Sequence, residues 1–187
     1  MTETIQKTSY FDAGNFRSSF DLKEALVETL KEHHSDERDI IVLCIGSDRS
    51  TGDSLGPLIG YKLAKYKMTR VTIYGTLDNP VHAANLSDRL AEIRASFDNP
   101  FILAIDASLG TREHIGYVTI SDGPLRPGLG VKKELPDVGD IHITGIVNLS
   151  GMMETLLLQT TRLSKVMQLA DTISKAVLYG ISEYLGQ

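Results

Sequence analysis

The sequence predicts a three-layer α/β/α sandwich with a mostly parallel central sheet. Short apolar runs alternate with helical patterns along most of the 187 residues, an order typical of parallel strands joined by helices. Residues 40–45 are apolar throughout, as expected for a central strand buried on both faces. Residues 152–185 carry a long apolar stripe at helical spacing. This stripe predicts a final helix that covers the sheet or, alternatively, binds a partner helix.

The other elements follow in order from local signals. Residues 1–20 are polar and contain Gly14, so we expect a flexible N-terminal arm ahead of a single domain over residues 21–187. Asp21 fits the N-cap of a first helix, and Pro57 fits the first turn of a second. Further elements are expected as helices over residues 57–66 and 82–97, and as strands over residues 71–74, 101–105, 116–120 (more exposed) and 141–147.

Composition narrows the class of protein. A hydrophobic content of 42% fits one well-buried domain. The net charge of -5 gives no reason to expect binding to nucleic acid or to a membrane surface. Cys44 is the single cysteine and lies in an apolar run, which predicts an inert core residue and a reducing compartment. The sequence shows no signal-peptide pattern and no apolar run of membrane-spanning length, so we expect a cytoplasmic protein.

The loop after the first buried strand is the most informative segment. Its nearest alignment to a phosphate-binding loop places Asp53 where such loops carry lysine. A carboxylate there would repel a polyphosphate, which argues against nucleotide binding. Backbone N–H groups of this loop, which contains Gly46 and Gly52, are instead expected to stabilise an oxyanion.

A second aspartate, Asp106, directly follows the expected strand at residues 101–105. If this strand lies beside the first, Asp53 and Asp106 can face one another and share one proton. Such a pair combines a base that activates water with an acid that protonates a leaving amine. The alternative is structural: Asp53 or Ser54 caps the next helix, and Asp106 caps a turn.

Other polar residues near the expected site are candidates for substrate binding or for tuning the pair. They are Asp48, Arg49, Asp78, Asn79, Lys132 and Lys133. Asp48 would shift the pKa values of the pair or attract a cation or a basic peptide. Arg49 and Arg112 would orient a carboxylate or neutralise an oxyanion, and the lysines would meet an acidic substrate. The alternatives are solvated charges and, for residues 76–80, a turn that caps the next helix.

Three motifs, at residues 52–57, 105–107 and 120–135, resemble the bacterial spore germination protease family. Over almost its full length, and most closely at residues 45–53 and 74–83, the chain resembles the YyaC family of sporulation proteins, which shares that fold. The resemblance implies an aspartate-dependent endopeptidase that uses Asp53 and Asp106 on a spore or sporulation protein. It also implies a location in the cytoplasm of a sporulating cell or forespore. The alternative is a catalytically silent module that binds a sporulation partner.

Hydrogenase maturation proteases resemble the chain more distantly, and they add a later histidine that holds nickel. Residues 121–140 contain no histidine, which argues against this mode of action. His82 and His142 remain as substitutes, although a histidine within a strand is more often structural. We therefore expect no cofactor, with a divalent metal at Asp53 and Asp106 as the alternative. The sequence leaves open whether the chain forms a homo-oligomer.

Overall fold

The computed structural model describes residues 7–127 and 135–187. The strands are β1 (Thr8–Asp12), β2 (Ile40–Cys44), β3 (Val71–Tyr74), β4 (Phe101–Gly110), β5 (Tyr117–Asp122) and β6 (Ile141–Leu149). The helices are α1 (Ser18–His33), α2 (Leu55–Leu63), α3 (Leu86–Ser96), α4 (Glu154–Thr160) and α5 (Leu163–Leu185), with 3-10 turns at Gly52–Ser54 and Arg112–His114.

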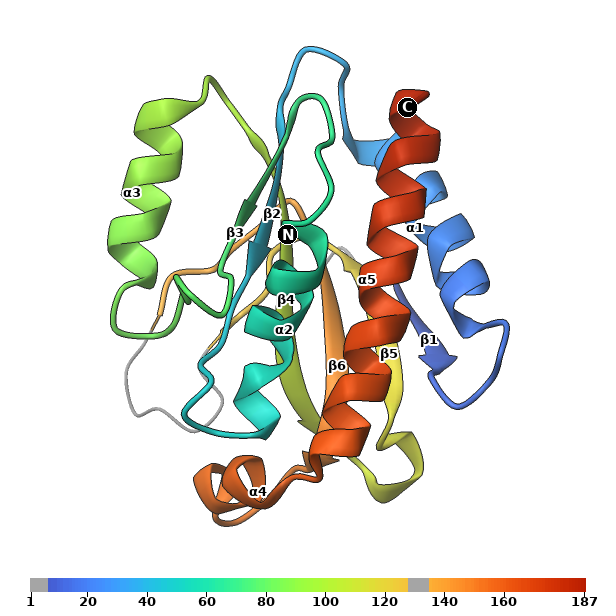
Figure 1. Cartoon of the computed structure of the whole chain (residues 1–187), viewed down its shortest axis with the longest axis vertical. Helices are drawn as coiled ribbons and strands as arrows, with labels where there is room; N and C mark the ends of the chain where they lie inside the picture. The colour runs from blue at the N-terminus through green and yellow to red at the C-terminus, as the bar shows by residue number, and fades with distance from the viewer. Residues whose placement is uncertain (1–6, 128–134) are drawn as a thin grey trace, which may run out of the picture.

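The described strands form one sheet in the order β1-β5-β6-β4-β2-β3. Strands β6, β4, β2 and β3 run parallel, whereas β5 and β1 pair antiparallel at one edge. Helices cover both faces of this sheet, as Figure 1 shows. The predicted three-layer α/β/α sandwich with a mostly parallel sheet is therefore confirmed, and β2 lies beside β4 as expected.

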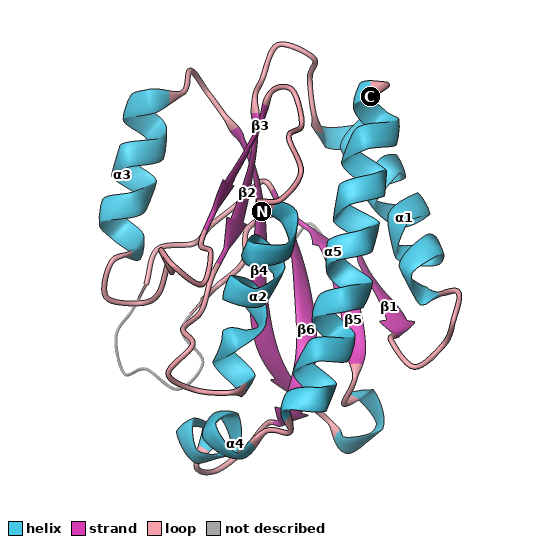
Figure 2. Cartoon of the chain, viewed as in Figure 1, coloured by secondary structure: helices cyan, strands magenta, loops and turns pink. Residues whose placement is uncertain are grey.

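Alternating side chains of the central strands fill two separate cores. Val42 of β2 and Ile105 of β4 point into the larger core, where α1, α2 and α5 pack. Ile41 and Leu43 point to the opposite face, where α3 packs. Figure 2 shows α3 on its own on one side of the sheet, with α2 and α5 on the other. Because every residue of β2 is buried, its continuous apolar run is explained by cover on both faces.

The prediction of a flexible arm over residues 1–20 is wrong for its described part. Residues from Thr8 onward form β1, which pairs with β5 from Thr8↔Ser121 to Asp12↔Tyr117. The first helix begins at Ser18, three residues before the expected cap at Asp21. The strand was missed because it lies at the sheet edge, where exposed positions alternate with partly buried ones and tolerate polar side chains. It also covers β5, which is more buried than expected.

The C-terminal stripe belongs to two helices. The chain leaves α4 at Thr161, whose backbone is extended, and starts α5 two residues later. The Thr161 hydroxyl donates to the Leu157 carbonyl at 2.7 Å and accepts from the Asn148 amide at 3.2 Å, which fixes this break against β6. The apolar stripe of α5 covers the sheet, as predicted. Among the helices of the described residues, none is long and apolar enough to cross a membrane.

Candidate active site

Asp53 and Asp106 line one pocket beyond the end of β2. Strand β2 has five residues and β4 has ten, and their last pair is Cys44↔Ile105. Strand β4 therefore continues past its neighbour, and Asp106 is the first residue without a partner on that side. The chain leaving β2 turns through Gly52–Ser54 before α2, which places Asp53 beside this uncovered edge. The structure thus brings together the two aspartates that the sequence singled out.

The pocket is small and mostly apolar apart from three titratable side chains. Its described lining consists of Ile45, Gly46, Asp53, His82, Ala83, Asp106, Ala107, Pro127, Leu135 and Leu158. These residues leave a volume of about 60 Å³, which is enough for a few water molecules. Asp106 is only 6% exposed. Burial of a carboxyl group among apolar neighbours disfavours its charged form, so this lining favours a raised pKa for the carboxyl groups in the pocket.

The two carboxyl groups differ in proton affinity. Burial raises the pKa of Asp106 well above its ordinary value, and the charge on Asp53 raises it further. The Ala107 N–H donates to Oδ1 of Asp106 at 2.7 Å and partly offsets this rise. Burial also raises the pKa of Asp53, but the Ser47 N–H and the attraction to His82 lower it. Asp53 therefore ionises first, while Asp106 keeps its proton to a higher pH.

The loop that carries Asp53 depends on a glycine. Gly46 has φ +141°, and a Cβ atom there would lie 2.0 Å from the Asp53 carbonyl oxygen, so only glycine allows this close approach. The Ser47 N–H donates to the same carbonyl at 3.0 Å. The Gly46 N–H donates to the Val81 carbonyl at 2.7 Å. The prediction that this N–H stabilises an oxyanion is therefore wrong, because a backbone acceptor already occupies it.

The second loop glycine faces helix α4 closely. A Cβ atom at Gly52 would lie 3.0 Å from the Leu158 and Thr161 side chains, so glycine here allows α4 to approach the loop. An oxyanion role for the Gly52 N–H stays a prediction. The capping alternative finds no support, since the N-cap of α2 has no side-chain cap bond and Ser54 Oγ donates to the Thr51 carbonyl.

The other predicted site residues within the described ranges are not among those that line the pocket. Asp48 and Arg49 are exposed in the same loop, and Asp78 is exposed after β3. Asn79 Oδ1 accepts a hydrogen bond from Arg89 of α3 at 2.9 Å, which gives it a structural partner. Lys132 and Lys133 lie outside the described residues. The tuning and substrate-binding roles of these residues stay predictions.

His82 also lines the pocket, although the sequence suggests it only as a substitute metal ligand. It lines the pocket because Val81 forms a parallel bridge with Ile45, directly after β2. His82 follows β3, whose carboxyl end lies at the same end of the sheet as those of β2 and β4, and this position could have indicated a place in the site. His142 lies on β6, where Nδ1 contacts the Gly123 carbonyl at 2.9 Å. Burial raises the pKa of the Cys44 thiol, as expected for an inert cysteine.

The described part of the chain holds no complete set of metal ligands. Within residues 7–127 and 135–187, no group of three His, Cys, Asp or Glu side chains could hold a metal ion. Asp53, Asp106 and His82 line the same pocket, but they do not form such a group. The expectation of no cofactor, with a divalent metal at Asp53 and Asp106 as the alternative, stays a prediction.

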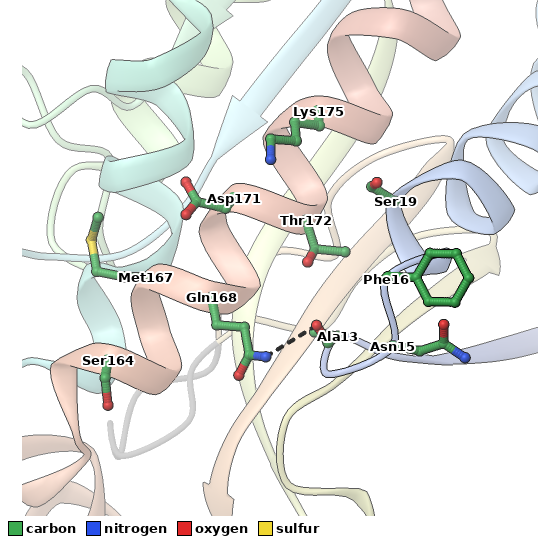
Figure 3. A pocket seen from close by; sticks show the side chains of 10 residues that line it. All are labelled: Ala13, Asn15, Phe16, Ser19, Ser164, Met167, Gln168, Asp171, Thr172 and Lys175. Carbon is green, nitrogen blue, oxygen red and sulfur yellow. Dashed lines mark hydrogen bonds between the residues drawn. The ribbon is translucent and has the colours of Figure 1, made fainter.

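A larger groove lies between the segment after β1 and helix α5, with a volume of about 500 Å³. Figure 3 shows the Gln168 side chain reaching Ala13, to whose carbonyl it donates at 3.2 Å. Asp171 in this groove is paired with Lys62 at 2.7 Å. The groove therefore holds a paired carboxylate, whereas the smaller pocket holds two carboxyl groups of raised pKa, which is the feature expected of a catalytic site.

Comparison with known proteins gives a family and a fold. The chain is 53% identical over 140 residues to the "Uncharacterized protein YyaC" of Bacillus subtilis (strain 168), an alignment that covers 75% of this chain and 68% of that protein. Its structure is similar to the [NiFe] hydrogenase maturation protease HycI from Thermococcus kodakarensis KOD1, with a TM-score of 0.53 and 18% identity. That match covers 85% of this chain and 99% of HycI, and it supports the fold alone. Residues 15–176 match the family described as "Protein of unknown function (DUF1256)", and the chain belongs to this family.

Proposed function

We propose that the protein is an aspartate-dependent peptidase that hydrolyses a peptide bond in a spore or sporulation protein. The observation that carries this proposal is the pair of carboxyl groups, Asp53 and Asp106, that line one pocket and differ in proton affinity. One ionised and one protonated carboxyl group side by side supply the base and the acid that amide hydrolysis needs.

The geometry suggests the role of each aspartate. The Asp53 carboxylate takes a proton from a water molecule, and the hydroxide oxygen forms a bond to the carbonyl carbon of the peptide. The carbon–nitrogen bond then breaks, and the leaving amine takes the proton of Asp106. The site ends with Asp53 protonated and Asp106 ionised, and transfer of one proton between them restores the starting state. The stronger burial of Asp106 supports its role as the acid.

The biological setting rests on resemblance. Residues 52–57 and 105–107, which carry the two aspartates, resemble the motifs of the spore germination protease. The matched relative is from Bacillus subtilis, and the fold is that of a maturation protease. We therefore propose a substrate among spore or sporulation proteins and a location in the cytoplasm of a sporulating cell or forespore.

The second candidate is a catalytically silent module that binds a sporulation partner. Two observations favour it: the pocket has a volume of only about 60 Å³ within the described residues, and the Gly46 N–H is already occupied. A silent module would retain the pocket and both aspartates without catalytic activity, and it would bind its partner without cleaving it.

Cleavage of spore proteins separates the two candidates. Wild type, Asp53→Asn, Asp106→Asn and the control Asp98→Asn, which changes an exposed aspartate in the turn after α3, are each incubated with a spore protein extract. New peptide termini are identified by mass spectrometry. The peptidase proposal expects new termini with wild type and Asp98→Asn, and a loss of at least about 100-fold in the two site variants. Equal cleavage by all four proteins would overturn the aspartate mechanism, and no cleavage by wild type would favour the silent module.

A further inference from the structure

His82 is held in a fixed position at the wall of the pocket. Its backbone N–H donates to Oδ1 of Asn85 at 2.8 Å, and the Asn85 side-chain amide in turn donates to the Pro80 carbonyl at 3.0 Å. The His82 carbonyl accepts hydrogen bonds from the backbone N–H groups of Asn85 at 3.0 Å and Leu86 at 2.9 Å. The backbone of His82 is thus fixed by the first turn before α3. His82 is one of the residues that line the pocket, and its ring is close enough to Asp53 to affect the pKa of that carboxyl group.

A backbone contact selects the tautomer of the ring. The Ala84 N–H points at Nδ1 of His82, with a nitrogen–nitrogen distance of 3.3 Å. An N–H donor requires a lone pair on the atom that accepts, so Nδ1 carries no proton and the neutral ring carries its proton on Nε2. Because Nδ1 is bound on its own loop, Nε2 is the ring nitrogen left to act as a donor in the pocket.

The segment that contains His82 also occupies the Gly46 N–H, a backbone donor of the loop after β2 that could otherwise bind a substrate oxygen. The Gly46 N–H is bound to the Val81 carbonyl, the residue directly before His82. This contact and the Ile45↔Val81 bridge join the His82 segment to the loop that carries Asp53. His82 therefore lines the pocket directly after Val81, the residue whose carbonyl accepts the Gly46 N–H.

We propose that His82 supplies the electrophilic group of the site, by donating the hydrogen on Nε2 to the carbonyl oxygen of the scissile peptide. This role rests on the proposed peptidase function and deepens it. As water adds to the carbonyl carbon, negative charge develops on that oxygen and strengthens the hydrogen bond. No proton leaves the ring, so the proton balance of Asp53 and Asp106 is unchanged. An aligned donor of this kind contributes mainly in the transition state.

The titratable groups that share the described lining with His82 are Asp53 and Asp106. A proton on Nδ1 would face the Ala84 N–H donor, so this contact fits a hydrogen on Nε2 alone. The other described residues of the lining carry no titratable group. The position of the hydrogen on the ring can be measured directly.

The first test reads the ring without any substrate. Two-dimensional 15N–1H spectra of the full chain at neutral pH distinguish the two nitrogens of His82, assigned with His82→Gln. We expect a neutral ring with the proton on Nε2. A proton on Nδ1 in the free protein, alone or together with Nε2, would overturn the proposal.

The second test uses cleavage kinetics on a substrate that wild type cleaves. We expect His82→Ala to lower kcat by about 100- to 1,000-fold with little change in KM, as found for loss of one oxyanion donor. His82→Gln, whose amide can donate near the Nε2 position, should recover part of this loss, and a merely structural role would not give that recovery. His33→Gln is the control. His33 is in α1 and pairs with Asp122 at 3.2 Å beside the start of β6, away from the pocket, so this variant should cleave as wild type does.

The outcomes separate the two proposals. If wild type cleaves and His82→Ala cleaves equally well, the role of His82 is wrong while the aspartate mechanism stands. If His82→Gln is as impaired as His82→Ala, the donor role is also wrong. If wild type cleaves no protein, the proposed function fails and this role fails with it.

Discussion

Burial raises the pKa of Asp106, and the charge on Asp53 raises it further across a pocket that both side chains line. This coupling arises from the different lengths of two neighbouring strands. Strand β2 ends at Cys44, while β4 continues to Gly110, so the loop from β2 passes beside Asp106. Two carboxyl groups in such a site do not ionise together. Asp106 keeps its proton because it is buried and because Asp53 is already charged.

The first prediction concerns stability against pH. Because the pKa of Asp106 is raised on folding, the folded chain binds more protons than the unfolded chain above the ordinary value of 3.8. The free energy of unfolding should therefore fall as pH rises from there through the raised pKa. Asp106→Asn, which stays neutral, should show a shallower fall in urea denaturation measured from pH 4 to 8. Each unit of pKa shift corresponds to about 1.4 kcal/mol.

Asp98→Asn serves as the control for this prediction, because Asp98 is exposed. Its pH dependence should match that of wild type. A slope for Asp106→Asn that is as steep as the wild-type slope would show that the buried carboxyl group is not the source of the effect.

The second prediction concerns the close approach at Gly46. A methyl group there would lie 2.0 Å from the Asp53 carbonyl oxygen. Gly46→Ala should lower the free energy of unfolding by about 1–3 kcal/mol and displace Asp53. Gly151 is a matched control: its φ is +145°, but nothing lies within 4 Å of a built Cβ atom. Gly151→Ala therefore retains only the backbone strain. Equal losses in thermal or urea unfolding of the two variants would refute the packing explanation.

The third prediction concerns metal. Since no group of three ligands in the described ranges could hold a metal ion, dialysis against a chelator should leave cleavage unchanged. Nickel or zinc added to the dialysed protein should leave its melting temperature within error of the untreated value. A rise in melting temperature that Asp53→Asn abolishes would instead support the alternative of a divalent metal at the aspartates.

Much of the fold is encoded in local sequence patterns. The strands β2 and β4 and the stripe of α5 were predictable because each buries a continuous or periodic set of apolar side chains. The edge strand β3 is only partly buried, but its β-branched and aromatic residues indicate a strand. Strand β1 at the other edge was not predicted, because exposed positions alternate with partly buried ones. The break between α4 and α5 was also missed, since it depends on hydrogen bonds from Thr161 to Leu157 and from Asn148.

The site was predictable where it depends on strand ends and unpredictable where it depends on loop contacts. Asp53 and Asp106 follow neighbouring strands, and the carboxyl ends of parallel strands meet at one edge. The place of His82 depends on the bridge between Ile45 and Val81, which local sequence does not reveal. Val81 also accepts the Gly46 N–H. The same segment therefore explains why this N–H is not free for an oxyanion and why His82 lies at the pocket.

The most direct test of the account is the pKa of Asp106 in wild type and in Asp53→Asn. Carbon-13 spectra of the aspartate carboxyl groups, recorded across pH and assigned with Asp106→Asn, give this value without a substrate. The account predicts a raised pKa for Asp106 in wild type and a lower one in Asp53→Asn, because a neutral amide replaces the neighbouring charge. An Asp106 pKa that is ordinary in wild type, or unchanged by Asp53→Asn, would contradict the claim that the two carboxyl groups act as a pair.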